Sequence, residues 1–295
     1  MKKPKVIVLR TAGTNCDKET VHAFQSAGAE TDLSHINEFI QGNKSLDRYG
    51  ILAIPGGFSY GDDIAAGKVL ANELIYKLRD SVEKFIKGGR LVIGICNGFQ
   101  VLVKTGLLPH STLTFNDSGK FEDRWVYLKN VNRGRCVFTK GIDRIYLPVA
   151  HAEGKFVTDK KTLDEMKKND EIVFRYVDDK GKDCGYPSNP NGSMENIAGI
   201  CNKEGTVFGM MPHPERYLAF YMHPQWTRLR SSNFGGQARL LESPNSRQAH
   251  KQSESSGSRQ ARKKIPQAGL PSEASAQEGD GIAIFRNAVR YASKL

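Results

Sequence analysis

Cys96 stands between two glycines in the stretch LVIGICNGFQ, residues 91–100, directly after an apolar run. A strand that ends in Gly-x-Cys-x-Gly and turns at once into a helix leaves no room for a Cβ at the flanking positions, Gly94 and Gly98. Backbone N–H groups and the positive end of the new helix then face the sulfur and favour its charged form. The pattern predicts a nucleophile, and the alternative is a buried structural cysteine.

A cysteine nucleophile needs a base and a group that orients the base. The stretch GMMPHPER offers both, with His213 just beyond an apolar run and Glu215 two residues later. Pro212 and Pro214 restrict the backbone on both sides of the imidazole. We expect His213 to take the proton of Cys96 and Glu215 to orient the ring. The alternative is a surface turn whose histidine and glutamate face water.

The developing oxyanion needs hydrogen-bond donors. The backbone N–H of Asn97, the residue after Cys96, is one candidate, and Gly57 in the stretch PGG is the other, because glycine lets the backbone approach a substrate closely. Gln100, one helical turn after the cysteine, is placed to read a substrate amide. The alternatives are a plain turn at Gly57 and a glutamine that only solvates its helix.

The elements that must position these groups alternate along the first hundred residues. Strands are predicted at 5–10, 50–57 and 91–95, and helices at 18–27, 69–86 and 99–105, the last ended by Gly106. Such alternation predicts a parallel sheet covered by helices on both faces. Ligands of these sheets bind beyond the carboxyl ends of the strands, where residues 55–57 and Cys96 fall.

The middle of the chain reads as shorter strands, at 124–131, 144–151, 171–178, 196–202 and 207–215. A last helix carries Ile282, Phe285, Val289 and Ala292 on one face, with Asp280 placed to cap it. We therefore predict an α/β domain formed by residues 1–226 and 279–295, with a mostly parallel sheet and a smaller antiparallel region. Residues 227–278 form a basic insert, and their Ser, Gln, Gly and Pro content predicts disorder.

Composition narrows the class of protein. The chain has 295 residues and a formal net charge of +11. Nine Lys or Arg against four Glu between Arg228 and Glu278 give +5 of that charge, so specific nucleic-acid binding is not expected. No apolar run is long enough to span a bilayer and no leader is recognised, which predicts a cytoplasmic protein. Five cysteines without a CxxC pair, and histidines without ligand spacing, predict neither a disulfide framework nor a metal site.

Several longer strings together resemble the class I (triad-type) glutamine amidotransferases, which have a flavodoxin-like fold. Within that class they are most similar to the glutaminase subunits of phosphoribosylformylglycinamidine synthase, in purine biosynthesis. The strings are GGFSYGDD (56–63), GICNGFQ (94–100), FNDSGKFEDRWV (115–126), PVAHAEGKF (148–156), MMPHPER (210–216) and HPQW (223–226). The resemblance covers about four fifths of the chain, and the insert is longer than the family would imply.

The resemblance implies a role for each matching residue. Cys96 would attack the side-chain amide of L-glutamine, forming a thioester and releasing ammonia, with His213 and Glu215 completing the triad. Gly57 and Asn97 match the oxyanion positions, and Gln100 matches a glutamine-contacting position. The resemblance also places Asn116 and Ser118 in the glutamine pocket and makes His151 a candidate for contact with the partner or with an ammonia channel.

The resemblance further implies a synthetase partner that uses the ammonia to convert formylglycinamide ribonucleotide to the amidine, and it leaves open a small accessory subunit. ATP and Mg²⁺ would belong to that partner, because this chain has no Gly-x-x-x-x-Gly-Lys-Ser/Thr loop, and no cofactor is expected here. Three alternatives remain: the glutaminase subunit of another class I amidotransferase, a cysteine hydrolase or stress protein of the same sheet architecture, and a non-catalytic binding protein.

Overall fold

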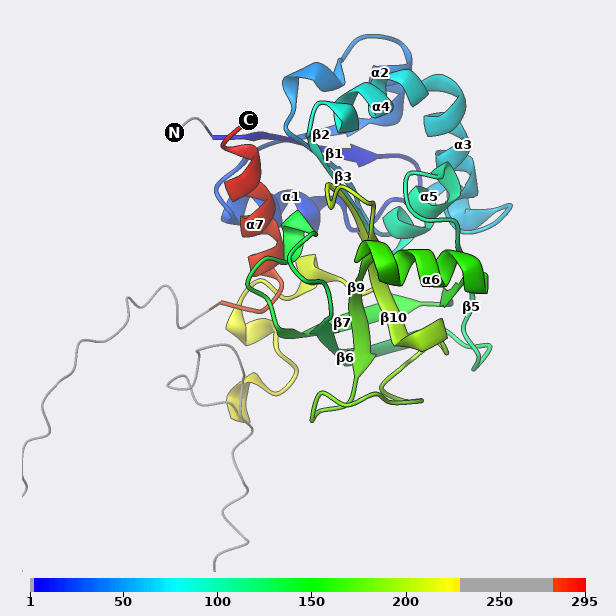
Figure 1. Cartoon of the computed structure of the whole chain (residues 1–295). Helices are drawn as coiled ribbons and strands as arrows, with labels where there is room; N and C mark the ends of the chain where they lie inside the picture. Colours follow the sequence, from blue (N-terminus) through cyan, green and yellow to red (C-terminus); the bar gives the residue numbers. More distant parts are fainter. Residues whose placement is uncertain (1–2, 229–277) are drawn as a thin grey trace, which may run out of the picture. The chain divides into compact units, whose positions relative to one another are not determined.

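The strands of this computed structural model, which describes residues 3–228 and 278–295, form one nine-stranded sheet and one separate pair (Figure 1). The order in the sheet is β2-β1-β3-β4-β11-β10-β9-β6-β7, and β5 pairs with β8. The bounds are β1 Lys5–Arg10, β2 Glu30–His35, β3 Ile51–Ile54, β4 Leu91–Ile95, β5 Thr112–Phe115, β6 Glu122–Asn130, β7 Arg144–His151, β8 Glu153–Val157, β9 Ile172–Val177, β10 Ile197–Cys201 and β11 Val207–Met210.

The first half of the sheet is parallel, as predicted. β1 pairs with β2 and β3, and β4 pairs with β3 and β11, all in parallel. β3 and β4 are buried at every position because helices cover both faces. From β1 the chain first moves to β2 on one side and then returns past β1 to β3 on the other side. Because both crossovers are right-handed, α1 lies on one face of the sheet and α3 and α4 lie on the other. The carboxyl ends beside this reversal are where the predicted site lies.

The second half of the sheet is antiparallel and continues the same layer. β10 pairs with β11 and β9, and β6 pairs with β9 and β7. Each antiparallel pairing reverses the strand direction, so β9 is parallel to β11 and β7 is parallel to β9. β7 therefore runs in the direction of β4 and β11, and its last residue, His151, reaches the same edge of the sheet as Cys96.

The helices are α1 Asp17–Ser26, α2 Ile36–Ile40, α3 Lys68–Lys77, α4 Arg79–Lys87, α5 Asn97–Thr105, α6 Lys160–Asn169 and α7 Ile282–Ala292. The predicted single helix over 69–86 is wrong, because the chain leaves helical geometry at Leu78, with φ −128°. Leu70, Leu74, Leu78 and Val82 are all buried. In one straight helix, positions four residues apart are rotated by about 40° relative to each other, so these four side chains would drift away from the core. The break at Leu78 lets the buried side chains of both α3 and α4 face the core.

Two elements have weak sequence signals. β2, with the sequence ETDLSH, is an outermost strand of the sheet and buries only Ser34. Its mostly polar sequence therefore gives no hydrophobic pattern from which a strand could be predicted. α6 buries only Leu163 and Met166, and its start is marked by Asp159, whose side chain accepts from the Thr162 N–H at 2.9 Å. Neither element contributes to the predicted site.

The last helix, α7, buries the predicted face and lies beside α1 (Figure 1). The Phe24 and Phe285 rings meet edge to face between the two helices, with centroids 4.9 Å apart. The predicted cap is wrong. Asp280 makes no capping bond to the helix, and its carboxylate accepts instead from the Tyr146 N–H at 2.9 Å. Burial raises the pKa of Asp280 to about 6. The aspartate ties the returning chain to β7.

The chain divides into two compact units, residues 1–218 with 280–295 and residues 219–279. In the described part of the second unit, Ala219 forms a bridge with Glu278. Residues 229–277 lie outside the described residues, so the disorder of the insert 227–278 stays a prediction. Among the residues that the structure describes, no helix combines the length and the apolar character needed to cross a bilayer.

Candidate functional site

Cys96 occupies the sharp turn between β4 and α5. Its φ of 52° and ψ of −106° lie in a region that non-glycine residues rarely adopt. A Cβ on Gly94 would lie 2.4 Å from the Gly98 carbonyl oxygen, and one on Gly98 would lie 1.9 Å from that of Ile54. Both glycines are therefore required by the close approach of α5 to the sheet, as the sequence predicted.

His213 and Glu215 follow β11, the neighbour of β4, and Glu215 lies in the short helix Pro214–Arg216. The Nδ1 atom of His213 lies 2.7 Å from Oε1 of Glu215, and both side chains are buried. Burial alone would lower the pKa of His213, but Glu215 and the sulfurs of Cys96 and Cys16 raise it well above its ordinary value. The pair is built to hold a proton on the imidazole.

The ring and the nucleophile meet beside Gly56. A Cβ on this glycine would lie 2.9 Å from Cε1 of His213 and 3.5 Å from Cβ of Cys96. Since Nδ1 is occupied by Glu215, Nε2 is the nitrogen available to the thiol, and it has no hydrogen-bond partner among the described residues. The structure thus brings the three predicted catalytic side chains together at one edge of the sheet.

Cys16 is a site residue that the sequence reasoning missed. Its sulfur lies 4.0 Å from Nδ1 of His213 and 3.0 Å from Nη2 of Arg216, which donates to it. It lies just after β1, and its N–H donates to the Gly56 carbonyl at 3.2 Å. Cys16 lies in the loop between β1 and α1, at the point where the chain changes from adding strands on one side of β1 to adding them on the other. Ligands of such sheets bind at this point, so this loop position could have predicted Cys16 as a site residue.

The two predicted oxyanion donors are free. In the described ranges, the backbone N–H groups of Gly57 and Asn97 donate no hydrogen bond. The Gly57 φ of 143° is one that side chains rarely allow, and a Cβ there would lie 2.7 Å from the Asn15 nitrogen. The Asn97 side chain is engaged elsewhere, since its oxygen accepts from the Ser59 N–H at 3.2 Å.

Cys16, Gly57, Cys96 and His213 line one pocket of about 440 Å³, whereas Asn97 and Glu215 are not part of its lining. Gln100 belongs to it, although its amide already donates to the Glu153 carbonyl at 2.6 Å and accepts from Asn97 at 2.9 Å. The residues around the pocket are Asn15, Cys16, Gly57, Phe58, Asp62, Ala66, Cys96, Gln100, Phe121, Asp123, Ala150, His151, Ala152, Glu153, His213 and Arg216. Phe58 and Phe121 are large apolar side chains about half exposed.

Asn116 and Ser118 are absent from the lining of this pocket. The Asn116 amide nitrogen donates to the Lys120 and His151 carbonyls, at 2.9 and 2.8 Å. Ser118 is exposed, and its hydroxyl accepts from the Lys120 N–H at 3.3 Å. The loop does reach the pocket, but through Phe121, so this geometry gives no support to a direct glutamine contact by the two predicted side chains.

The predicted partner or channel residue, His151, does line the pocket. It is 3% exposed, and burial together with the charge of His213 lowers its pKa to about 3. The preceding carbonyl, of Ala150, lies 3.7 Å from the Cys96 sulfur. His151 is therefore a neutral imidazole close to the nucleophile.

One group in the described part of the chain has the chemistry of a metal site, because donor atoms of Cys16, His213 and Glu215 all lie within 4.8 Å of one another. Two of them are already joined as the base and its orienting carboxylate. The Arg216 guanidinium faces the third, so a bound cation would be opposed by its charge.

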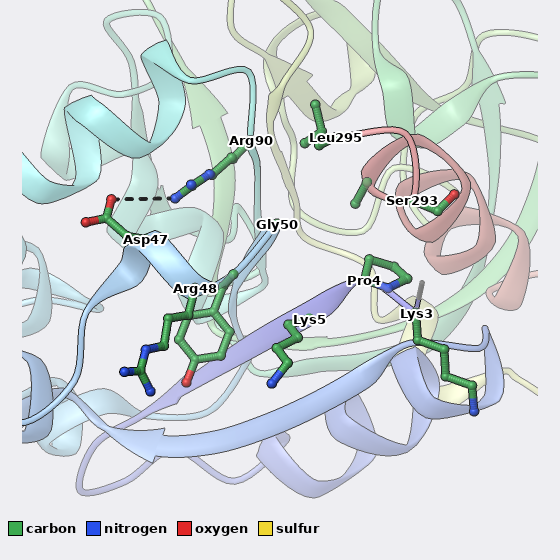
Figure 2. Close-up of a pocket in the computed structure, with 11 residues that line it drawn as sticks. Lys3, Pro4, Lys5, Asp47, Arg48, Gly50, Arg90, Ser293 and Leu295 are labelled. Carbon is green, nitrogen blue, oxygen red and sulfur yellow. Dashed lines mark ion pairs between the residues drawn. The ribbon is translucent and has the colours of Figure 1, made fainter. Parts of the chain in front are cut away.

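A second pocket, of about 520 Å³, lies at the amino ends of β1, β3 and β4 (Figure 2). Lys3, Lys5, Arg48 and Arg90 give it a basic lining, with Arg90 3.8 Å from Asp47. None of the predicted site residues lies there. The predicted catalytic residues therefore lie at the other end of the parallel strands, beyond their carboxyl ends.

Comparison with known proteins shows the family of the chain. Residues 3–245 match the CobB/CobQ-like glutamine amidotransferase domain, and the chain belongs to that family. The phosphoribosylformylglycinamidine synthase subunit PurQ of Dehalococcoides mccartyi is 42% identical over 303 residues, covering all of both chains. The protein of the same name from Methanococcus maripaludis is 49% identical over 234 residues, which is 76% of this chain and 86% of that one.

A solved structure agrees as well. A chain in the structure of PurLQS from Thermotoga maritima is 38% identical, with a TM-score of 0.60, and the match covers 73% of this chain and 90% of that one. The mixed sheet with helices on both faces is thus the fold of this family, as predicted.

Proposed function

We propose that the chain is the glutaminase subunit of phosphoribosylformylglycinamidine synthase and releases ammonia from L-glutamine for a synthetase partner. The observation that carries the proposal is that Cys96 and His213 line one pocket, with the buried Glu215 carboxylate 2.7 Å behind the imidazole. Two free N–H donors beside the nucleophile, and a relative named for this subunit whose match covers the whole chain, support it.

The chemistry follows from the atoms in the pocket. Nε2 of His213 accepts the thiol proton, and the Cys96 thiolate attacks the carboxamide carbon of glutamine. The N–H groups of Gly57 and Asn97 bind the oxyanion, where one such donor is typically worth about 10²- to 10³-fold in rate. The imidazolium returns its proton to the departing nitrogen, so ammonia leaves and a γ-glutamyl thioester remains. Water then hydrolyses the thioester to glutamate.

The partner is the synthetase that consumes the ammonia, and ATP and Mg²⁺ belong to it. The half-exposed Phe58 and Phe121 beside the pocket are apolar surface that a partner would cover. The name PurLQS of the related structure agrees with an assembly of more than one chain type. We leave a small accessory subunit open and propose it only as a component to test for in the purified complex.

The test is the Cys96→Ala variant. We expect it to lose glutamate release from glutamine by about 10⁴-fold or more, alone and with the synthetase, while synthesis driven by added ammonia survives in the complex. Cys184→Ala is the matched control, since that thiol lies outside the pocket. Covalent labelling with 6-diazo-5-oxo-norleucine should modify Cys96 alone. Unchanged turnover in Cys96→Ala would reject the proposal.

A further inference from the structure

The imidazole of His151 is held beside the nucleophile by strand β7. The strand ends at this residue, and the preceding carbonyl lies 3.7 Å from the Cys96 sulfur. The ring packs against Gly154, where a Cβ would lie only 2.4 Å from the ring carbon Cε1. The glycine thus makes room for the ring, and the ring has little freedom to turn.

Asn116 fixes which nitrogen of the ring carries hydrogen. Its amide nitrogen donates to two carbonyl groups, of Lys120 and His151, so the other amide atom is the oxygen. That oxygen accepts from the Gly154 N–H at 3.2 Å and lies 3.1 Å from Nδ1 of His151. Since an amide oxygen only accepts, Nδ1 must carry the hydrogen and Nε2 must present a lone pair.

This lone pair is unused. Nε2 of His151 is buried and has no hydrogen-bond partner among the described residues. A buried acceptor without a partner is unfavourable, and the low pKa of His151 means that protonation does not relieve it. Because His151 is one of the residues that line the pocket, its unused acceptor points to a partner that arrives with the ligand.

We propose that Nε2 of His151 accepts a hydrogen bond from the carboxamide NH₂ of the substrate and so selects an amide over a carboxylate. The inference rests on the proposed function and names the residue that reads the group to be cleaved. Glutamine offers an N–H to the lone pair. Glutamate offers only oxygens, which the lone pair repels, so the same atom disfavours the product.

The test compares two substrates that differ in this N–H. L-Glutamic acid γ-methyl ester keeps the carbonyl carbon and the amino acid but has a methoxy leaving group. In His151→Leu we expect kcat/KM for glutamine to fall about 10- to 100-fold, the order expected for one lost hydrogen bond. The value for the ester should change less than about threefold. His151→Gln, which keeps an acceptor, should recover part of the glutamine activity.

Val149→Ala, on the same strand and outside the pocket, is the control for a general disturbance of β7. It should lower both activities together. An equal loss on both substrates in His151→Leu would overturn the proposal, as would full glutamine activity in that variant. If His151→Leu does not fold, His151→Phe, which keeps a ring but has no acceptor, gives the same comparison. A wild-type protein without turnover of glutamine would instead refute the proposed function itself.

Discussion

The pKa of His213 is subject to opposing influences. Burial disfavours the imidazolium, while Glu215 and the two nearby sulfurs favour it and prevail. Because Glu215 lies two residues away on the same short turn, its effect on His213 could be predicted from the sequence. The Cys16 contribution could not, since 197 residues separate the two in the chain and only the fold brings them together.

Glu215→Gln should therefore move the alkaline limb of the pH profile. Glu215 raises the pKa of His213, so the wild-type imidazolium, which protonates the departing nitrogen, persists to higher pH. Without that carboxylate the ring loses its proton at a lower pH, and kcat/KM for glutamine should begin to fall at a lower pH. The profile is measured from pH 5 to 10, and Glu83→Gln, at a half-exposed position outside the pocket, is the control. An alkaline limb at the wild-type position would contradict the role of Glu215.

At the scale of elements, the site depends on how closely α5 approaches the parallel strands. Gly98 touches the β3 backbone, and Gly94 faces Gly98 across the turn. This contact holds the strained backbone of Cys96 in place and leaves the Asn97 N–H free for a ligand. The motif announces the turn, but the partner of Gly98, which is the Ile54 carbonyl, is known only from the pairing of β3 with β4.

Gly98→Ala should consequently disrupt the fold at the site. Its Cβ would lie 1.9 Å from the Ile54 oxygen, a backbone atom that cannot move aside as a side chain can. We expect a loss of about 3 kcal/mol and a fall of roughly 5–10 °C in Tm, measured by calorimetry. Gly185→Ala, where a Cβ meets nothing within 4 Å, should leave Tm nearly unchanged. Equal Tm values for the two variants would refute the close-packing argument.

At the scale of the whole molecule, the first compact unit is interrupted by residues 219–279. The chain leaves and returns at adjacent points, because the Gly281 N–H donates to the Tyr217 carbonyl at 2.9 Å. Asp280 then fastens the return to β7, and α7 covers α1. The last helix therefore belongs to the first domain despite its distance in sequence.

Replacing residues 230–277 by a short Gly-Ser linker should leave this domain folded. Ala219 already pairs with Glu278, and Tyr217 with Gly281, so these contacts hold the two flanks together without the replaced residues. We expect Tm to change by no more than about 2 °C and glutamate release to stay within about twofold of the full chain. Aggregation of the shortened protein, or a clear loss of its cooperative thermal transition, would show that residues 230–277 support the domain.

The sequence by itself determined the local features of this protein. Apolar runs and turn glycines predicted every strand of the nine-stranded sheet except β2. Gly-x-Cys-x-Gly and the Pro-bracketed His-Pro-Glu predicted the nucleophile and the base, because each is formed by a few neighbouring residues. Only the tertiary structure decided which distant groups share the pocket. Strand order brings Cys16 and His151 to the edge that carries Cys96, and it directs the Asn116 side chain to His151 instead of into the pocket. Such contacts arise from packing across the sheet, and no short stretch of chain encodes them.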